Sequence, residues 1–344
     1  MATKTRKRSR KAVAAIGAGV LALSALAVGY HRARTGVSPE AATRELLATA
    51  DEAAATGATA TGATADAGDA GIMGTVGESS AGATGQPGWD IPNLDHSRVD
   101  YWIGRFQTDK RSDFETYLNR MGRYASLIST ELAKRDMPQD LVYLAMIESG
   151  FNPKAYSSAK ASGLWQFIGA TASRYGLDIN RAVDERNDPV KATTAALDYL
   201  GDLHQRFGSW YLAAAAYNMG ENGLTRILRA ALGRATGTDA DYYAVWSRLP
   251  KETRDYVPLM VAAARIAKDP AEYGFTDIEP LAPYAFSEIV ARPATPLKTL
   301  AQKAGTTVKA IKDLNPQLKL DRTRNDESMV VRVPAGEAAV GAAD

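Results

Sequence analysis

Apolar side chains recur every three or four positions through most of the chain after Trp89, which is the spacing of one face of an α-helix. No alternating pattern typical of a strand occurs between residues 110 and 270. We therefore expect a helical domain over residues 89–280, with helices over Phe114–Leu132, Pro138–Glu148, Val190–Phe207, Tyr211–Tyr217, Leu224–Leu232 and Lys251–Ala267.

Two local signals predict where helices begin. Ser112-Asp113-Phe114-Glu115 has the pattern of a capping box, in which the first and fourth side chains bond the helix start. Asp188-Pro189 pairs an N-cap residue with a proline suited to the first helical position.

The C-terminal part of the chain follows a different pattern. It predicts strands over Phe286–Val290 and Met329–Pro334, and short helices over Pro296–Ala304 and Val308–Leu314. The order β-α-α-β indicates a small separate unit over residues 284–335. The predicted fold class is therefore mainly α, with a helical domain followed by a small βααβ module.

The N-terminus combines a basic start with an uncharged apolar stretch. Six Lys and Arg residues lie within residues 1–11, and the 19 residues 12–30 carry no charge. This pattern predicts that residues 1–36 are either a signal peptide, cleaved after Ala25-Leu26-Ala27, or a membrane anchor. Arg32 and Arg34, just beyond that site, favour the uncleaved anchor slightly. Both interpretations place the remaining chain across a membrane.

Residues 37–88 have the composition of a flexible linker. From Asp51 to Gln86, 25 of 36 residues are Ala, Gly or Thr. Such a segment buries too little apolar surface to offset the entropy of ordering it, so we expect it to be disordered.

The composition excludes several kinds of chemistry. The 41 Lys and Arg residues nearly balance 39 Asp and Glu residues, giving a net charge of +2, which argues against a nucleic-acid partner. The chain has no cysteine, so it has no disulfide, thiolate metal site or cysteine nucleophile. The three histidines share no metal-binding spacing, and no phosphate-binding glycine loop or serine nucleophile motif is present. We expect no metal and no organic cofactor.

A carboxylate is the remaining candidate for catalysis. Glu148 ends an apolar helix and precedes Ser149-Gly150, a position typical of a cleft edge. Partial burial there would raise its pKa, as a general acid at neutral pH requires. From the local sequence alone, an ordinary solvated glutamate at a helix end is the more common explanation of this pattern.

The residues that follow resemble a known family. Four motifs occur in the family's order and spacing: Glu148-Ser149, Gly163-Leu164-Trp165-Gln166-Phe167, Ala216-Tyr217-Asn218-x-Gly220 and Tyr256-Val257. Together they resemble the SLT domain of lytic murein transglycosylases, most closely the membrane-bound D branch, over residues 115–275. One departure is Gly169, where the family usually has proline; because this position starts a helix, we expect only a local effect.

The resemblance implies a lysozyme-like helical fold and non-hydrolytic cleavage of peptidoglycan. The bond cut would be the β-1,4 bond between N-acetylmuramic acid and N-acetylglucosamine. Ordinary glycosidases use two carboxylates, whereas this family uses one. Glu148 would protonate the leaving oxygen and then deprotonate the sugar's own C6 hydroxyl, which attacks C1. The product would carry a 1,6-anhydromuramoyl end.

The resemblance also implies roles for residues around Glu148. Ser149 would hydrogen-bond near it, Gln166 would bind a sugar, Tyr217 and Asn218 would line the cleft, and Tyr256 would hold the carboxyl group. Without the resemblance, Tyr217, Asn218 and Tyr256 would all be assigned to the core, since buried tyrosines are common and usually find a partner. Trp165 and Trp210 could stack on sugars, but core packing is the more common use. If a second carboxylate were needed, Glu252 would be the candidate.

The module over residues 284–335 resembles a LysM domain, a fold that binds glycans containing N-acetylglucosamine. Its helical part fits well, but Ala294-Thr295-Pro296-Leu297 stands where the family has its G-D-T-L opening. A degenerate module that only packs on the catalytic domain therefore remains an equal alternative.

We expect the chain to act as a monomer on peptidoglycan glycan strands, exported to the periplasmic side of the cell envelope with a possible membrane tether. Two alternatives remain: a non-catalytic peptidoglycan-binding scaffold with the same fold, and a muramidase that hydrolyses the same bond with water. The intact Glu148-Ser149 favours an enzyme over the scaffold.

Overall fold

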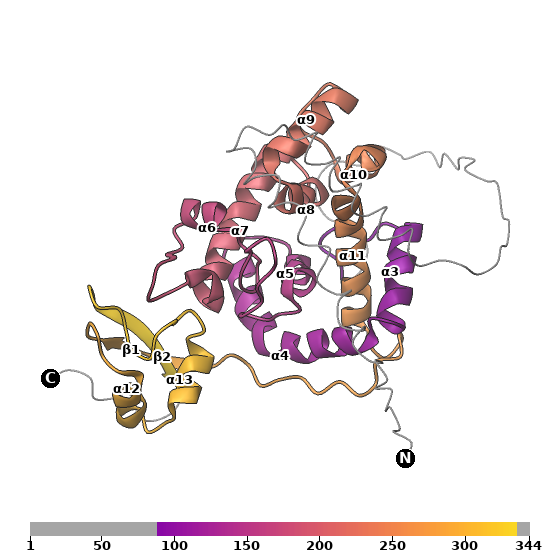
Figure 1. The fold of residues 1–344 in the computed structure, drawn as a ribbon. Helices are drawn as coiled ribbons and strands as arrows, with labels where there is room; N and C mark the ends of the chain where they lie inside the picture. Colours follow the sequence, from indigo (N-terminus) through magenta and orange to yellow (C-terminus); the bar gives the residue numbers. More distant parts are fainter. Residues whose placement is uncertain (1–87, 336–344) are drawn as a thin grey trace, which may run out of the picture.

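The structure is a computed structural model that describes residues 88–335 (Figure 1). The predicted signal or anchor over 1–36, and the linker over 37–88 except for its last residue, lie outside the described residues. Among the helices from residue 88 to 335, none is long and apolar enough to cross a membrane.

Helices make up most of the described chain, and a two-stranded sheet follows them. In order these are α3 (Ser97–Gln107), α4 (Arg111–Ala133), a 3-10 turn (Gln139–Leu141), α5 (Val142–Ser149), α6 (Gly169–Arg174), a 3-10 turn (Glu185–Asn187), α7 (Pro189–Phe207), α8 (Trp210–Met219), α9 (Glu221–Leu232), α10 (Asp239–Ala244), a 3-10 turn (Trp246–Arg248), α11 (Lys251–Lys268), β1 (Phe286–Ala291), α12 (Leu297–Lys303), α13 (Val308–Leu314) and β2 (Met329–Pro334). The predicted fold class, mainly α with a small βααβ module, is confirmed.

Helix α5 lies in the middle of the helical domain and packs against α4 and α11 (Figure 1). Its residues 142–146 are all buried. A helix that is apolar on every side is stable only inside a core, where each face finds a partner. The run of alanines at 213–216 in α8 is also fully buried, and such small side chains let neighbouring helices approach closely. The sequence thus places the helix that ends in Glu148 at the centre of the domain.

One predicted helix start is confirmed and another is wrong. The Asp188 carboxylate accepts hydrogen bonds from the backbone of Val190 and Lys191, and Pro189 opens α7, as expected. The capping box at 112–115 does not form, because α4 begins earlier, at Arg111, in a tight turn that directly follows α3. Lys110 occupies its N-cap position without a side-chain bond.

The proline at 138 opens a single 3-10 turn rather than the predicted helix. Regular α-helix starts only at Val142, so the helix that carries Glu148 is shorter than expected.

An extended segment connects the two parts of the molecule. Residues 269–285 run along α4 (Figure 1), where the backbone of Leu281 and Tyr284 bonds to carbonyls of Asn119 and Arg123. Strands β1 and β2 then pair antiparallel, with Phe286 opposite Pro334 and Ala291 opposite Met329. The module therefore lies beside the helical domain rather than at the end of a free tether.

Candidate active site

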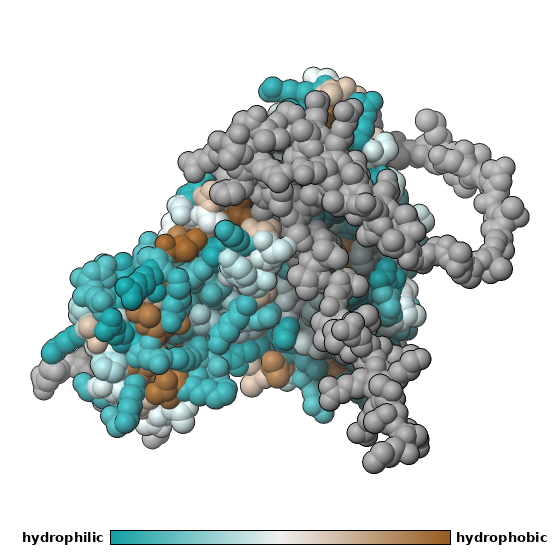
Figure 2. All heavy atoms as spheres, viewed as in Figure 1, coloured by the Kyte–Doolittle hydropathy of each residue, from teal (hydrophilic) through white to brown (hydrophobic). Residues whose placement is uncertain are grey.

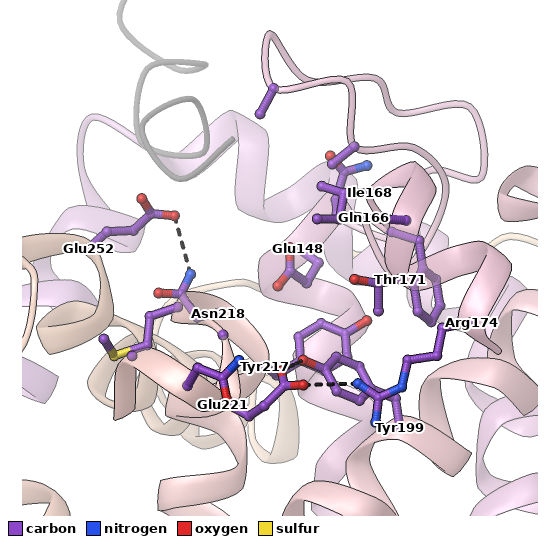
Figure 3. Close-up of a pocket in the computed structure, with 18 residues that line it drawn as sticks. Glu148, Gln166, Ile168, Thr171, Arg174, Tyr199, Tyr217, Asn218, Glu221 and Glu252 are labelled. Atoms are coloured by element: carbon purple, nitrogen blue, oxygen red, sulfur yellow. Dashed lines mark hydrogen bonds and ion pairs between the residues drawn. The ribbon is translucent and has the colours of Figure 1, made fainter. Parts of the chain in front are cut away.

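A cavity of about 460 Å³ opens beside the end of α5 and is lined from five segments of the helical domain. The lining residues are Glu148, Ala159, Ala161, Gln166, Phe167, Ile168, Ala170, Thr171, Arg174, Tyr199, Tyr217, Asn218, Met219, Gly220, Glu221, Asn222, Gly223 and Glu252. Figure 3 shows the Glu148 carboxyl group pointing into this space, between Gln166 on one side and Asn218 on the other. Four of the predicted site residues thus share one cavity: Glu148, Gln166, Tyr217 and Asn218.

Glu148 is held at the cavity by the way its helix ends. Gly150 adopts a left-handed conformation with φ 56° and caps α5. A Cβ at this position would lie 2.1 Å from the Tyr117 ring, so only glycine fits. The chain therefore turns away immediately after Glu148, which leaves its side chain at the wall of the cavity rather than inside a continuing helix.

Burial makes Glu148 an acid at neutral pH. The residue is only 7% exposed, and the lost hydration of the charged form raises its pKa to about 8. The hydrogen bond from Tyr256 works in the opposite direction, whereas the negative charge of Glu252 raises the pKa further. The carboxyl group is therefore protonated at pH 7 and can donate its proton.

Tyr256 of α11 is the direct partner of Glu148. Its hydroxyl donates a hydrogen bond to Glu148 Oε1 at 2.5 Å, and both side chains are buried. Burial and the adjacent carboxyl group raise the pKa of Tyr256 well above its usual value, so it stays a donor. Tyr256 is not among the residues that line the cavity, so it contacts Glu148 from the side of the protein core.

Tyr217 and Asn218 leave the end of α8 in different directions. The Tyr217 hydroxyl donates to the carbonyl of Trp165 at 2.8 Å, which joins α8 to the segment containing Gln166. Asn218 accepts a hydrogen bond from Thr253 Oγ1 at 2.8 Å and donates from Nδ2 to Glu252 Oε1 at 3.2 Å (Figure 3). Asn218 is thereby fixed between two side chains of α11.

Ser149 lies beside the cavity, not in its lining. Its hydroxyl donates to the carbonyl of Leu164 at 2.8 Å and accepts a bond from the backbone of Asn152. It ties the end of α5 to the next motif. Gln166 donates from Nε2 to the carbonyls of Gly163 and Ala155, and its backbone is left-handed, with φ 47°. Both residues hold the local geometry around Glu148.

Trp165 is a core residue. Its side chain is fully buried and its indole nitrogen donates to Thr193 Oγ1 at 3.0 Å. Gly169 begins α6, the helix start expected at this departure from the family.

The sequence reasoning did not assign the far end of the cavity. There Arg174 donates to Glu221 at 2.9 Å, and Tyr199 donates to the other oxygen of that carboxylate at 3.1 Å (Figure 3). Glu221 follows the Tyr217-Asn218-x-Gly220 motif directly, and this proximity was the available signal. Glu252, considered only as a reserve carboxylate, also lines the cavity, and burial raises its pKa.

The described residues 88–335 contain no group of three or more His, Asp or Glu side chains placed to hold a metal ion. The buried carboxyl group of Glu148, with its raised pKa, can transfer a proton to or from a group bound in this cavity.

Comparison with known protein families identifies both parts of the chain. Residues 126–237 match the family model of the transglycosylase SLT domain, and residues 285–342 match that of the LysM-like domain of the lytic transglycosylase MltD. Both matches agree with the resemblance drawn from the sequence motifs.

Among curated proteins, the membrane-bound lytic murein transglycosylase D of Escherichia coli strain K12 is 34% identical over 239 residues. The aligned region covers 68% of this chain and 52% of that relative. A putative tributyltin chloride resistance protein of Alteromonas sp. strain M-1 is 45% identical over 108 residues, covering 31% of this chain and 51% of that protein. The chain thus spans about half the length of the curated relatives it matches.

Among solved structures, the 70 kDa soluble lytic transglycosylase of Escherichia coli is 27% identical, covering 45% of this chain and 25% of its own. Its TM-score of 0.35 is too low for a conclusion about shared architecture. The family matches carry the assignment: the chain contains a transglycosylase SLT domain and, C-terminal to it, a LysM-like domain of the lytic transglycosylase D type.

Proposed function

We propose that this protein is a peptidoglycan lytic transglycosylase that cleaves the β-1,4 bond between N-acetylmuramic acid and N-acetylglucosamine without water. The observation that carries the proposal is the state of Glu148: a buried carboxyl group with a pKa of about 8, bonded to Tyr256 and facing a cavity large enough for sugar rings. The relatives named as murein transglycosylases support the substrate class.

One acid-base group suffices for this reaction. Protonated Glu148 donates its proton to the glycosidic oxygen as the bond from that oxygen to C1 breaks. The resulting carboxylate then takes the proton of the C6 hydroxyl of the same muramic acid, and the oxygen of that hydroxyl bonds to C1. This closes the 1,6-anhydro ring and returns Glu148 to its protonated state. Because the nucleophile is already part of the substrate, high effective molarity replaces an activated water.

The surrounding residues fit supporting roles in this scheme. Tyr256 orients the Glu148 carboxyl group and stabilises it when it is briefly charged. Gln166, Tyr217 and Asn218 form the walls that receive the sugars, and Ser149 fixes the end of α5. Each of these roles combines what the family resemblance implies with the position of the side chain beside Glu148 or in the cavity.

We place the protein at the periplasmic side of the cell envelope, exported by residues 1–36 and acting as a monomer. The name of the membrane-bound relative supports an envelope location. The linker over 37–88 would let the catalytic domain reach glycan strands away from the membrane.

A water-using muramidase is the second candidate, because Glu252 lines the same cavity and could act as the base for water. Mass spectrometry of the glycan fragments released from purified peptidoglycan separates the candidates. We expect the wild type and Glu252→Gln to give anhydromuramoyl ends and Glu148→Gln to give none. Reducing ends that disappear in Glu252→Gln would identify a hydrolase. Retained binding to peptidoglycan with no products from the wild type would indicate a scaffold.

A further inference from the structure

The C-terminal module, residues 284–335, contacts the helical domain at α4, where the Tyr284 amide donates to the carbonyl of Arg123, and also at a loop, residues 178–188, which we call the docking loop. Val183 of this loop is 1% exposed and belongs to the core of the module, among Leu297, Ile311 and Val331. In the other direction, Leu314 of the module packs into the core of the helical domain. The two parts thus share apolar cores, which a freely tethered binding module would not do.

Backbone hydrogen bonds join the docking loop to the module. Val183 forms an isolated antiparallel bridge with Leu318. On either side of it, the Asp184 amide donates to the carbonyl of Gln317, and the Lys319 amide donates to the carbonyl of Ala182, both at 2.9 Å. Residues 317–319 of the module therefore pair with residues 182–184 of the docking loop in the manner of a short β-strand.

A buried ion pair anchors the same contact. Arg332 of β2 donates to the Asp188 carboxylate at 2.9 Å, and the two side chains are 6% and 3% exposed. The other oxygen of Asp188 caps α7. The intact pair adds little net stability, because the cost of removing both charges from water offsets most of their attraction. Removing one partner is costly, because the other charge is then buried alone. The ion pair fixes where the loop ends relative to the module.

The docking loop in turn holds the wall of the cavity. The Asp184 carboxylate binds the buried Arg186 guanidinium through two hydrogen bonds, at 2.9 and 2.7 Å. Arg186 then donates to the carbonyls of Lys160 and Phe167, at 2.7 and 3.1 Å. We call residues 160–168 the cavity wall, since four of them, residues 161, 166, 167 and 168, line the cavity.

The loop and the wall are in close backbone contact. A Cβ on Gly163 would lie 1.8 Å from the carbonyl oxygen of Arg186. Ser162 adds a hydrogen bond to Asn187 at 2.7 Å. A displacement of the loop therefore moves the wall, because close-packed segments transmit strain rather than absorb it.

We propose that the C-terminal module braces the substrate cavity through the docking loop, and that Arg186 is the positioning residue that carries this support to the cavity wall. The module then acts on the shape of the cavity beside Glu148, whether or not it binds glycan itself. The kinetic consequence of the brace rests on the proposed function, whereas its structural consequence does not.

Hydrogen exchange measured by mass spectrometry on the full chain tests the brace. We compare Val183→Ala and Val183→Asp with Val290→Ala and Val290→Asp, since Val290 belongs to the same module but is 71% exposed on its outer side. Figure 2 shows the surface over this module as mainly hydrophilic with separate hydrophobic patches. We expect exchange in both the docking loop and the cavity wall to become about tenfold faster in Val183→Ala, since a truncated core valine loosens its surroundings by roughly that factor.

In the same measurement α5 and α11 keep wild-type exchange, and both Val290 variants match the wild type throughout. Faster exchange of the docking loop with an unchanged cavity wall would overturn the proposal. Should Val183→Asp unfold, Val183→Ala decides the outcome. Arg186→Lys is expected to loosen the cavity wall while residues 178–183 stay as in the wild type, because lysine keeps the charge but loses the forked contact. An unchanged wall in Arg186→Lys contradicts the role of Arg186.

A kinetic measurement on soluble glycan strands completes the test. For Val183→Ala we expect KM to rise more than kcat falls, with the pH dependence that Glu148 sets left at its wild-type position. A lower kcat at an unchanged KM would contradict a role in shaping the cavity. If the wild type cleaves no glycan, the proposed function fails, while the exchange data still decide whether the module braces the cavity.

Discussion

Replacing Tyr256 with phenylalanine probes the acid at the centre of the cavity with the loss of one oxygen atom. That hydroxyl donates to Glu148 Oε1 at 2.5 Å in a buried site. A hydrogen bond to the charged form favours ionisation, so its removal raises the pKa of Glu148 above its value of about 8. Hydrogen bonds to charged groups contribute about 1.5–3 kcal/mol, which corresponds to a rise of about 1–2 pKa units.

The assay is the pH dependence of kcat/KM on soluble glycan strands. Because Glu148 must be protonated to donate, we expect the wild-type activity to fall as pH rises through about 8. In Tyr256→Phe this fall moves about 1–2 pH units higher, although the rate at neutral pH is lower because the carboxyl group is less well oriented.

Tyr217→Phe is the matched control. Its hydroxyl bonds to the carbonyl of Trp165 rather than to Glu148, so its alkaline limb stays at the wild-type pH whatever its rate. A Tyr256→Phe profile that is unshifted, or shifted to lower pH, would refute the assignment of Tyr256 as the hydrogen-bond donor that stabilises ionised Glu148.

Three further predictions concern stability, each read from chemical denaturation. Because the folded-state pKa of Glu148 is raised to about 8, the free energy of unfolding of the wild type falls as pH rises from about 4.5 through 8. Glu148→Gln lacks this pH dependence, so its stability relative to the wild type should rise by up to about 4 kcal/mol between pH 5 and pH 9. A stability difference between the two proteins that stays constant with pH would contradict the raised pKa. Gly163→Ala should lower the free energy of unfolding by more than about 2 kcal/mol, since the added Cβ meets the backbone of Arg186. Gly176 is also left-handed but faces open space, so Gly176→Ala should lower it by only about 1 kcal/mol. Equal losses in the two variants would argue against the close contact. Asp188→Asn should cost about 3–5 kcal/mol, because the buried Arg332 then keeps only the half-exposed Glu288, 3.6 Å away, as a charge partner. Asp178→Asn, at an exposed pair with Arg324, should cost at most about 1 kcal/mol; similar small losses would show that the module is not docked through Asp188.

The helical pattern of the sequence was sufficient to locate most of the fold. Helix α13 and strand β2 have the predicted bounds, and α7 and α11 differ from theirs by a single residue. The failures are local: the capping box at 112–115 does not form because a tight turn begins the helix earlier, and α3 and α10 were not predicted as separate helices. Periodicity reports which face of a long helix is buried, but it carries little information over six residues.

The candidate site depended on different information. Glu148 was identified from its helix end and family motif, but its pKa follows from burial that only the folded chain creates. Pairings such as Asn218 with Glu252 and Arg332 with Asp188 join residues far apart in the sequence, so no local pattern encodes them. Asp188 illustrates this limit well: its role as an N-cap was visible in the sequence, whereas its ion pair with the module was not.

Cleavage of peptidoglycan in water enriched with the heavy oxygen isotope ¹⁸O tests the central claim most directly. If Glu148 alone transfers protons and the C6 hydroxyl attacks C1, mass spectrometry will find anhydromuramoyl fragments that carry no ¹⁸O. Reducing ends with one ¹⁸O atom for each bond cleaved would contradict the account, because they would show that water is the nucleophile.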